Sequence, residues 1–294
     1  MPRVPDELVT TVVYLFPSSE AAEAGERAGG TGFLMSIPFT NSLLAHWYVV
    51  TNRHVIDSGC RTVGFNWYDG TRWHHEIEEA DWERHELGYD VAAAWLPFNL
   101  FNEDDHFNAF DVEALLTEET FRDWEVGLGD EMLLVSRHLG HQGRVKNRPI
   151  VHSGMLSLSP PDLVYNKYRS LEELSFLVEA RSWGGFSGSM VLGYISSRNP
   201  DFQRGETTDR AFILGVLWGH ISIKEPVRDR SGEGTGDFVE VNSGVAAVVP
   251  AWRIREVLNQ QKLVSERARF EKHWTEQMRK LGRVVDDPGE NRII

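Results

Sequence analysis

Hydrophobic residues in the first hundred positions gather in short runs between turn-forming residues. Runs of strand length cover residues 9–16, 32–37, 43–51, 63–67, 73–77 and 90–96. β-Branched and aromatic residues crowd several of these runs, and Asp69-Gly70 between the fourth and fifth is a strong signal for a hairpin turn. About six short strands at this spacing predict a small closed barrel.

A second series of runs follows an acidic stretch at residues 102–123, where Asp111 is expected to cap a helix. The later runs cover residues 130–136, 150–158, 174–181, 211–218 and 238–249, with a polar glycine loop expected at 227–237. The acidic stretch separates the two series. We therefore predict two six-stranded antiparallel β-barrels, at residues 1–118 and 119–250.

The hydrophobic pattern becomes helical after Pro250. One stripe consists of Ile254, Val257 and Leu258. A second stripe consists of Phe270, Trp274, Met278 and Leu281. The predicted fold class is therefore all-β with a C-terminal helical extension at residues 251–294. The second helix either packs on the chain's own barrels or binds a partner, which could be a second copy of the chain.

Composition narrows the class of protein. The chain has 294 residues, of which 41% are apolar, and a net charge of −14, which argues against a nucleic-acid surface. Cys60 is the only cysteine, so no internal disulfide is possible, and this suits a reducing compartment. The first residues lack a signal-peptide core, and no apolar run reaches the roughly 18 residues of a membrane span. We expect a cytoplasmic protein that does not bind membranes.

The most informative stretch for chemistry is Arg181-Ser-Trp-Gly-Gly-Phe-Ser187-Gly-Ser189. Gly185 and Gly188 flank Ser187, as an exposed nucleophile requires. The N–H groups of Gly185 and Ser187 could stabilise the oxyanion of a tetrahedral intermediate. The alternative is a plain glycine-rich turn.

A serine hydroxyl needs a general base to become a good nucleophile. His54 ends an apolar run in a turn, and Asp90 enters another apolar run. Taken singly, a structural histidine is the more common case for His54, and a residue that simply begins a strand is the more common case for Asp90. The order His54, Asp90, Ser187 is the chain order of the chymotrypsin group.

The chain resembles the trypsin-like serine peptidases, in particular the disulfide-free bacterial and HtrA-like branch. The matching segments are Val49-Val-Thr-Asn-Arg-His54, Tyr89-Asp90-Val-Ala, Gly185-Phe-Ser187-Gly-Ser, Leu214-Gly-Val-Leu-Trp218-Gly219 and Ser243-Gly-Val-Ala-Ala-Val-Val-Pro250. The resemblance implies an active site in the cleft between the barrels. It also implies that His54 is the base, that Asp90 orients it and that no cofactor takes part.

The resemblance also suggests how substrate is bound. Trp218 and Gly219 correspond to the strand beside the substrate, Arg181 to the floor of the primary specificity pocket, and His220 to its entrance. A basic floor favours cleavage after Asp or Glu. Alternatively, Arg181 pairs with an acidic neighbour such as Glu179 or Glu240.

One departure from the family concerns activation. Phe186 stands where the secreted zymogens carry the aspartate that pairs with a new N-terminus. Because Phe186 cannot form that ion pair, we expect control by an activating protein partner or by ordering of loops.

The sequence therefore predicts a serine endopeptidase acting on protein or peptide substrates. The alternative is a catalytically silent trypsin-like module that binds or regulates other proteins. No metal site is expected, because none of the histidines lies in a His-Glu-x-x-His motif and surface histidines are the more common case.

Overall fold

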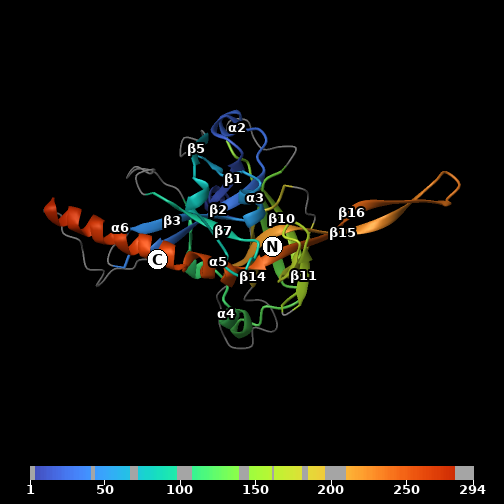
Figure 1. Ribbon diagram of the computed structural model, residues 1–294. Helices are drawn as coiled ribbons and strands as arrows, with labels where there is room; N and C mark the ends of the chain where they lie inside the picture. The colour runs from blue at the N-terminus through green and yellow to red at the C-terminus, as the bar shows by residue number, and fades with distance from the viewer. Residues whose placement is uncertain are drawn as a thin grey trace.

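The structure is a computed structural model that describes residues 4–40, 44–66, 72–97, 108–138, 146–160, 162–180, 185–195 and 210–281. The described chain is mostly β-structure and has two helices near its C-terminal end (Figure 1). A closed barrel and a curled sheet form the body of the molecule, and two long projections extend from it.

The first half of the chain forms one curled, mainly antiparallel sheet. Its strands neighbour one another in the order β5-β4-β1-β2-β3-β7-β6, and β8 pairs with β2 in parallel. The bounds are β1 Val12–Phe16, β2 Gly30–Pro38, β3 Ala45–Thr51, β4 Thr62–Asn66, β5 Arg72–Glu76, β6 Trp82–Arg84, β7 Ala92–Leu96 and β8 Phe110–Asp111. In the described ranges the sheet has eight strands, of which β8 lies off this path, and it does not close, whereas the sequence predicted a closed ring of six.

The second half forms the closed six-stranded antiparallel barrel that the sequence predicted. Its strand order is β10-β13-β16-β15-β14-β9. The bounds are β9 Glu131–Ser136, β10 Ile150–Leu158, β13 Phe176–Ala180, β14 Ser189–Ile195, β15 Arg210–Arg228 and β16 Gly234–Pro250. A separate hairpin, β11 (Leu163–Asn166) and β12 (Leu171–Leu174), lies between β10 and β13 in the chain.

Short helices connect the strands, and longer ones end the chain. They are α1 Asp6–Thr10, α2 Ser19–Ala24, α3 Arg53–Asp57, α4 Glu118–Asp123, α5 Ala251–Leu258 and α6 Gln261–Lys280, with 3-10 turns η1 Glu79–Asp81 and η3 Val112–Ala114. Asp111 does act as a cap, since its side chain accepts from the Glu113 N–H, but it caps only a 3-10 turn. Among the described helices, none has the length and apolarity needed to cross a membrane.

The first terminal stripe and Phe270 of the second stripe pack against the body of the protein. Ile254, Val257 and Leu258 of α5 are fully buried. On α6, the Phe270 ring lies against Trp95 and the ring of His46, with centroids 5.3 and 6.0 Å away. Packing on the chain's own sheet is therefore observed for this part of the second stripe.

The β15–β16 pair extends well beyond the barrel as a two-stranded ribbon (Figure 1). The sequence predicted a loop at residues 227–237, but β15 continues to Arg228 and β16 begins at Gly234. The first predicted strand also needed local correction, because residues 9–10 belong to α1. Residues 19–24 form a helix, and the Ser18 side chain caps it by accepting from the Ala21 N–H.

One hydrophobic cluster runs through both halves of the chain. It joins residues of the first sheet, such as Phe33 and Tyr48, to residues of the second barrel, such as Trp218 and Val248. The two halves are thus packed directly on one another. The candidate site lies where they meet.

Candidate active site

His54 lies in α3, immediately after strand β3. Its ring atom Nδ1 is 2.6 Å from Asp90 Oδ2, and its backbone N–H donates to Asp90 Oδ1 over 2.9 Å. Asp90 is fully buried, whereas 15% of the His54 side chain is exposed. One carboxylate therefore fixes both the main chain and the ring of a histidine that solvent can still reach.

Asn52 connects this pair to the serine turn of the second half. Its Nδ2 donates to the Asp90 carbonyl oxygen over 2.7 Å, and its Oδ1 accepts the Gly188 N–H. The side chain is fully buried. A single amide thus links the segment that carries Asp90 to the turn that carries Ser187.

The serine turn is held tightly against strand β2. Ser187 O accepts from the Thr31 N–H over 2.8 Å, and Ser189 N–H closes the turn onto Phe186 O over 2.9 Å. Gly188 adopts a left-handed conformation with φ +84°, and a Cβ built there would stand 1.8 Å from Thr31 O. Only glycine fits between this turn and the first sheet.

The Ser187 side chain points to strand β15 rather than to the histidine. Its hydroxyl donates to the Trp218 carbonyl oxygen over 3.2 Å. Among the described residues it makes no hydrogen bond with His54. The structure thus brings His54 and Asp90 into contact and places Ser187 on a turn that is bonded to the same segment.

The two predicted oxyanion donors occupy the expected turn. Gly185 has φ +89°, a backbone conformation that glycine adopts readily. Within the described part of the chain, the N–H groups of Gly185 and Ser187 have no protein acceptor.

The remaining predicted residues are only partly described. Trp218 is buried, and its Nε1 donates to Ser175 Oγ over 3.0 Å, while Gly219 and His220 continue along β15. Burial, together with the charge of Lys167, holds the pKa of His220 below its usual range. Arg181, the predicted pocket floor, lies outside the described residues.

Phe186 occupies an apolar setting beneath the serine turn. The side chain is 1% exposed, and its ring centroid is 5.2 Å from that of His152. Phe186 therefore supports the turn by packing. The zymogens of the trypsin-like peptidases, which the chain resembles, use an ion pair at this position.

Three residues of the β11–β12 hairpin belong to the site and were missed from the sequence. Asn166 and Glu173 contact Asp90, and the ring of Tyr168 stacks on that of His54 with centroids 4.4 Å apart and 10° between planes. Asparagine in a polar turn and glutamate in a Leu-Glu-Glu-Leu run carry no chemical motif. Only the topology brings them to the site.

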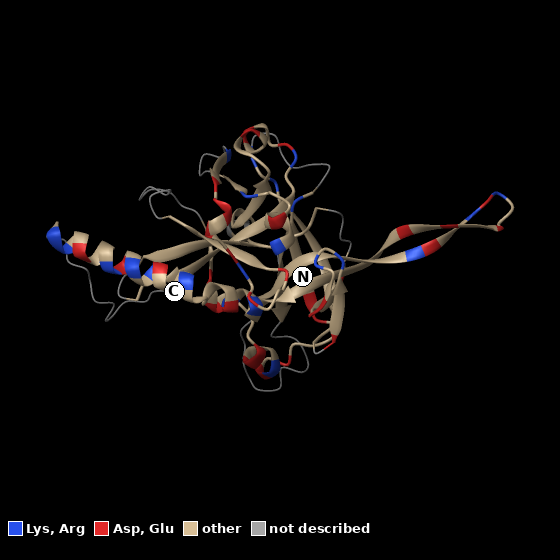
Figure 2. Ribbon diagram, in the orientation of Figure 1, with Lys and Arg blue, Asp and Glu red and all other residues tan. Residues whose placement is uncertain are grey.

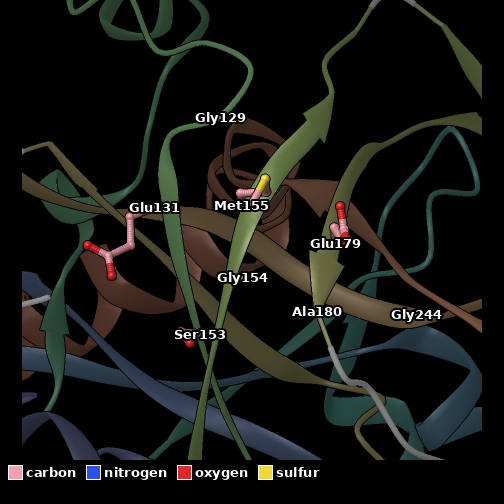
Figure 3. Close-up of a pocket in the computed structure, with 8 residues that line it drawn as sticks. All are labelled: Gly129, Glu131, Ser153, Gly154, Met155, Glu179, Ala180 and Gly244. Atoms are coloured by element: carbon pink, nitrogen blue, oxygen red, sulfur yellow. The ribbon is translucent and has the colours of Figure 1, made fainter.

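A separate hollow of about 510 Å³ lies on the second barrel (Figure 3). Its lining includes Glu131, Met155 and Glu179, and it contains none of the three candidate catalytic residues. The described residues include no cluster of three or more His, Cys, Asp or Glu side chains that could hold a metal ion.

The strand arrangement defines a trypsin-like, or chymotrypsin, fold, as the sequence motifs predicted. No protein-family model and no curated protein matches the chain. Among solved structures, the Rv3671c protease of M. tuberculosis H37Rv in its inactive form aligns with a TM-score of 0.43 and 15% identity, over 86% of this chain and 89% of that chain. Human heparin binding protein aligns with a TM-score of 0.48 and 12% identity, over 88% and 96%. Likenesses this distant carry no argument about activity.

Proposed function

We propose that the chain is a serine endopeptidase that hydrolyses peptide bonds in protein substrates. The observation that carries this proposal is the 2.6 Å contact between His54 Nδ1 and Asp90 Oδ2, beside a serine turn bonded to the same segment. A proton on Nδ1 that is donated to Asp90 leaves Nε2 as an acceptor. That is the form of histidine that a general base requires.

The proposed reaction follows the order of acyl transfer. Ser187 Oγ bonds to the scissile carbonyl carbon while its proton passes to His54 Nε2. The C–N bond then breaks, and His54 returns the proton to the leaving amine. A water molecule attacks the acyl-enzyme in the same way and releases the carboxylic acid. The N–H groups of Gly185 and Ser187 would hold the oxyanion in both steps.

The position of the Ser187 hydroxyl supports control of this activity. Before it can react, the side chain must rotate from the Trp218 carbonyl oxygen toward His54. Catalytic hydrogen bonds in free enzymes are often formed only when substrate is bound. Rotation that accompanies substrate binding, loop ordering or a partner protein would couple activity to those events.

The same observation favours a second candidate function. A serine that is bonded away from its histidine, with the Tyr168 ring over that histidine, also suits a silent trypsin-like module that binds or regulates other proteins. The two proposals differ in one measurable property, which is the nucleophilicity of Ser187.

Labelling of the intact protein with a fluorophosphonate distinguishes them. We expect covalent labelling of wild type that is abolished by Ser187→Ala. The matched control is Ser189→Ala, which removes a buried hydroxyl two residues further on, and it should keep the label. Wild type that stays unlabelled, with its fold intact and candidate activators present, would favour the silent module.

The specificity prediction remains a proposal. If Arg181 forms the pocket floor, a peptide library should show cleavage after Asp or Glu, and Arg181→Ala should remove that preference. A preference for basic or large apolar residues would contradict it.

A further inference from the structure

Asn166 is fully buried, and its amide group uses all of its hydrogen-bonding capacity. Its Nδ2 donates to Asp90 Oδ2 over 3.1 Å and to Glu173 Oε1 over 2.6 Å. Its Oδ1 accepts the N–H groups of Tyr168 and Arg169 over 2.9 and 3.3 Å. Because two carboxylates face Nδ2 and two N–H groups face Oδ1, the orientation of the amide is determined by its partners.

Glu173 completes the arrangement from the neighbouring strand. Its side chain is buried, and its Oε2 accepts the Asp90 N–H over 2.9 Å while Oε1 accepts from Asn166. Asp90 is consequently held on every polar atom. His54 and Asn166 bind its carboxylate, Glu173 binds its N–H, and Asn52 binds its carbonyl oxygen.

The geometry points to Asn166, fixed by Glu173, as a positioning residue for the candidate site. We propose that it holds the Asp90 carboxylate in the orientation that binds the His54 ring. Asp90 belongs to the first half of the chain and Asn166 to the second, so docking of the β11–β12 hairpin would complete the site. This inference rests on the proposed function, because it assigns a role within the same reaction.

The hairpin is attached to the histidine helix in two further places. Arg169 Nη1 lies 3.3 Å from Asp57 Oδ2 at the end of α3, and Arg53 and Arg84 share that carboxylate. The Tyr168 ring stacks on His54 itself. Exposed ion pairs contribute little singly, but here they bind the hairpin to the element that carries His54.

The test compares Asn166→Ala and Glu173→Gln with two neighbours in the same hairpin that point to solvent. Tyr165 is 58% exposed and Glu172 is exposed, so Tyr165→Ala and Glu172→Gln are matched controls. The rate constant of fluorophosphonate labelling is measured well below the melting temperature of each variant. We expect the rate constant of labelling to fall roughly 10- to 100-fold in Asn166→Ala, with the affinity for the probe unchanged. Misplacement of a catalytic group by about 1 Å has an effect of this size. Both controls should keep the wild-type rate constant.

A second measurement does not depend on activity. In proton NMR, the proton between His54 Nδ1 and Asp90 gives a far-downfield signal when the two groups are held together. We expect this signal in wild type and in both controls, and its broadening or loss in Asn166→Ala. The positioning role is wrong if Asn166→Ala keeps both the NMR signal and the wild-type rate constant of labelling. If wild type is not labelled, the NMR signal alone decides. Wild type that shows the signal but is not labelled would overturn the proposed function alone.

Discussion

Gly188 is the residue that leaves the serine turn least freedom. Its N–H binds both the Leu217 carbonyl oxygen and Asn52, and its α-carbon faces Thr31 O and Thr51 Oγ1. The turn is therefore bonded to the second barrel on one side and packed on the first sheet on the other. A side chain at this position would separate the two halves at the candidate site.

We predict that Gly188→Ala lowers both the labelling of Ser187 and the free energy of unfolding. The new Cβ meets backbone at 1.8 Å, so the turn must move, and labelling should fall by about 100-fold or more. Gly236→Ala is the matched control, because its φ of +87° is similar but nothing lies within 4 Å of its Cβ. Gly236→Ala should lower the free energy of unfolding in urea by about 1–2 kcal/mol and leave labelling unchanged. Equal effects of the two changes would mean that backbone strain alone is responsible.

Glu173 should make stability depend on pH. Burial raises its pKa to about 7, and the Asp90 charge adds to the rise, while hydrogen bonds from Asn166 and the Asp90 N–H oppose it. The folded state therefore holds the proton more tightly than the unfolded chain between pH 4.5 and about 7. The stabilisation is complete below that window and is lost as the pH rises through it.

The measurement is urea unfolding of wild type and Glu173→Gln at pH 5 and pH 8. From pH 5 to pH 8, the free energy of unfolding of wild type should fall by on the order of 3 kcal/mol relative to that of the variant, since each pKa unit corresponds to about 1.4 kcal/mol. Glu172→Gln, one residue away and exposed, should change with pH as wild type does. If the free energy of unfolding changes with pH by the same amount in wild type and in Glu173→Gln, Glu173 is ionised at both pH values.

At the scale of elements, the tip of the β11–β12 hairpin lies against the histidine. The Tyr168 ring covers one face of His54, and a Cβ built on Gly219 would stand 3.0 Å from Tyr168 Cε2. The ring thus lies between the proposed base and strand β15 at Gly219. A substrate group next to the reacting carbonyl would have to share this space.

We predict that Tyr168→Ala widens the range of substrates without loss of chemistry. Labelling by a small fluorophosphonate should change by less than about threefold, whereas labelling by a peptidyl probe with a bulky residue at this place should rise about tenfold. Tyr165→Ala serves as the control on the same hairpin. A loss of labelling with both probes would instead show that stacking on Tyr168 is needed to orient His54.

Sequence patterns predicted those elements whose signals are local. Apolar runs predicted most of the barrel strands, and the motifs around His54 and Asp90 predicted the contact that the structure shows. Asp69-Gly70 predicted a hairpin whose flanking strands, β4 and β5, do pair, although the turn itself lies outside the described residues.

The parts that were missed depend on contacts far apart in the chain. Asn166 lies 76 residues from Asp90, and Glu173 lies 83 residues from it. No local pattern tells that Glu173 is buried while Glu172 is exposed, because hairpin pairing alone decides which face each occupies. Likewise, the polar ribbon of β15 and β16 lacks apolar alternation, and its pairing follows from the barrel strands that it continues.

At the scale of the whole molecule, two projections leave the body and differ in how they are attached (Figure 1). Along α6, Arg267 Nη1 donates to Tyr48 Oη over 2.9 Å, and Glu271 Oε1 lies 2.9 Å from the buried His46 Nε2. Both α6 and the ribbon carry mixed charges along their length (Figure 2). In the ribbon, however, residues 224–240 are exposed except for a half-buried Val227.

The two projections should therefore respond differently to removal. In one variant, Asn-Gly replaces residues 224–240 and closes the Ile223–Val241 pair as a two-residue hairpin. In the other, the chain ends after Val264. We expect the shortened ribbon to keep the free energy of unfolding within about 1 kcal/mol of wild type, because it loses no fully buried residue. The truncated helix should lose roughly 3–5 kcal/mol, because it removes Phe270 from its aromatic neighbours and leaves His46 Nε2 buried without its acceptor.

Within the described part of the chain, His54, Asp90 and Ser187 make no hydrogen bond or ring contact with either removed segment, so both variants should keep fluorophosphonate labelling of Ser187 under conditions in which they are folded. Urea unfolding gives the stability of each variant, and size-exclusion chromatography shows whether self-association changes. A truncated chain as stable as wild type would mean that α6 contributes little to the fold and is free to bind a partner or a second copy of the chain. A shortened ribbon that keeps its stability and its labelling but no longer cleaves a protein substrate would instead assign the ribbon to substrate capture. The ribbon would then extend strand β15, whose Trp218 carbonyl oxygen binds the Ser187 hydroxyl.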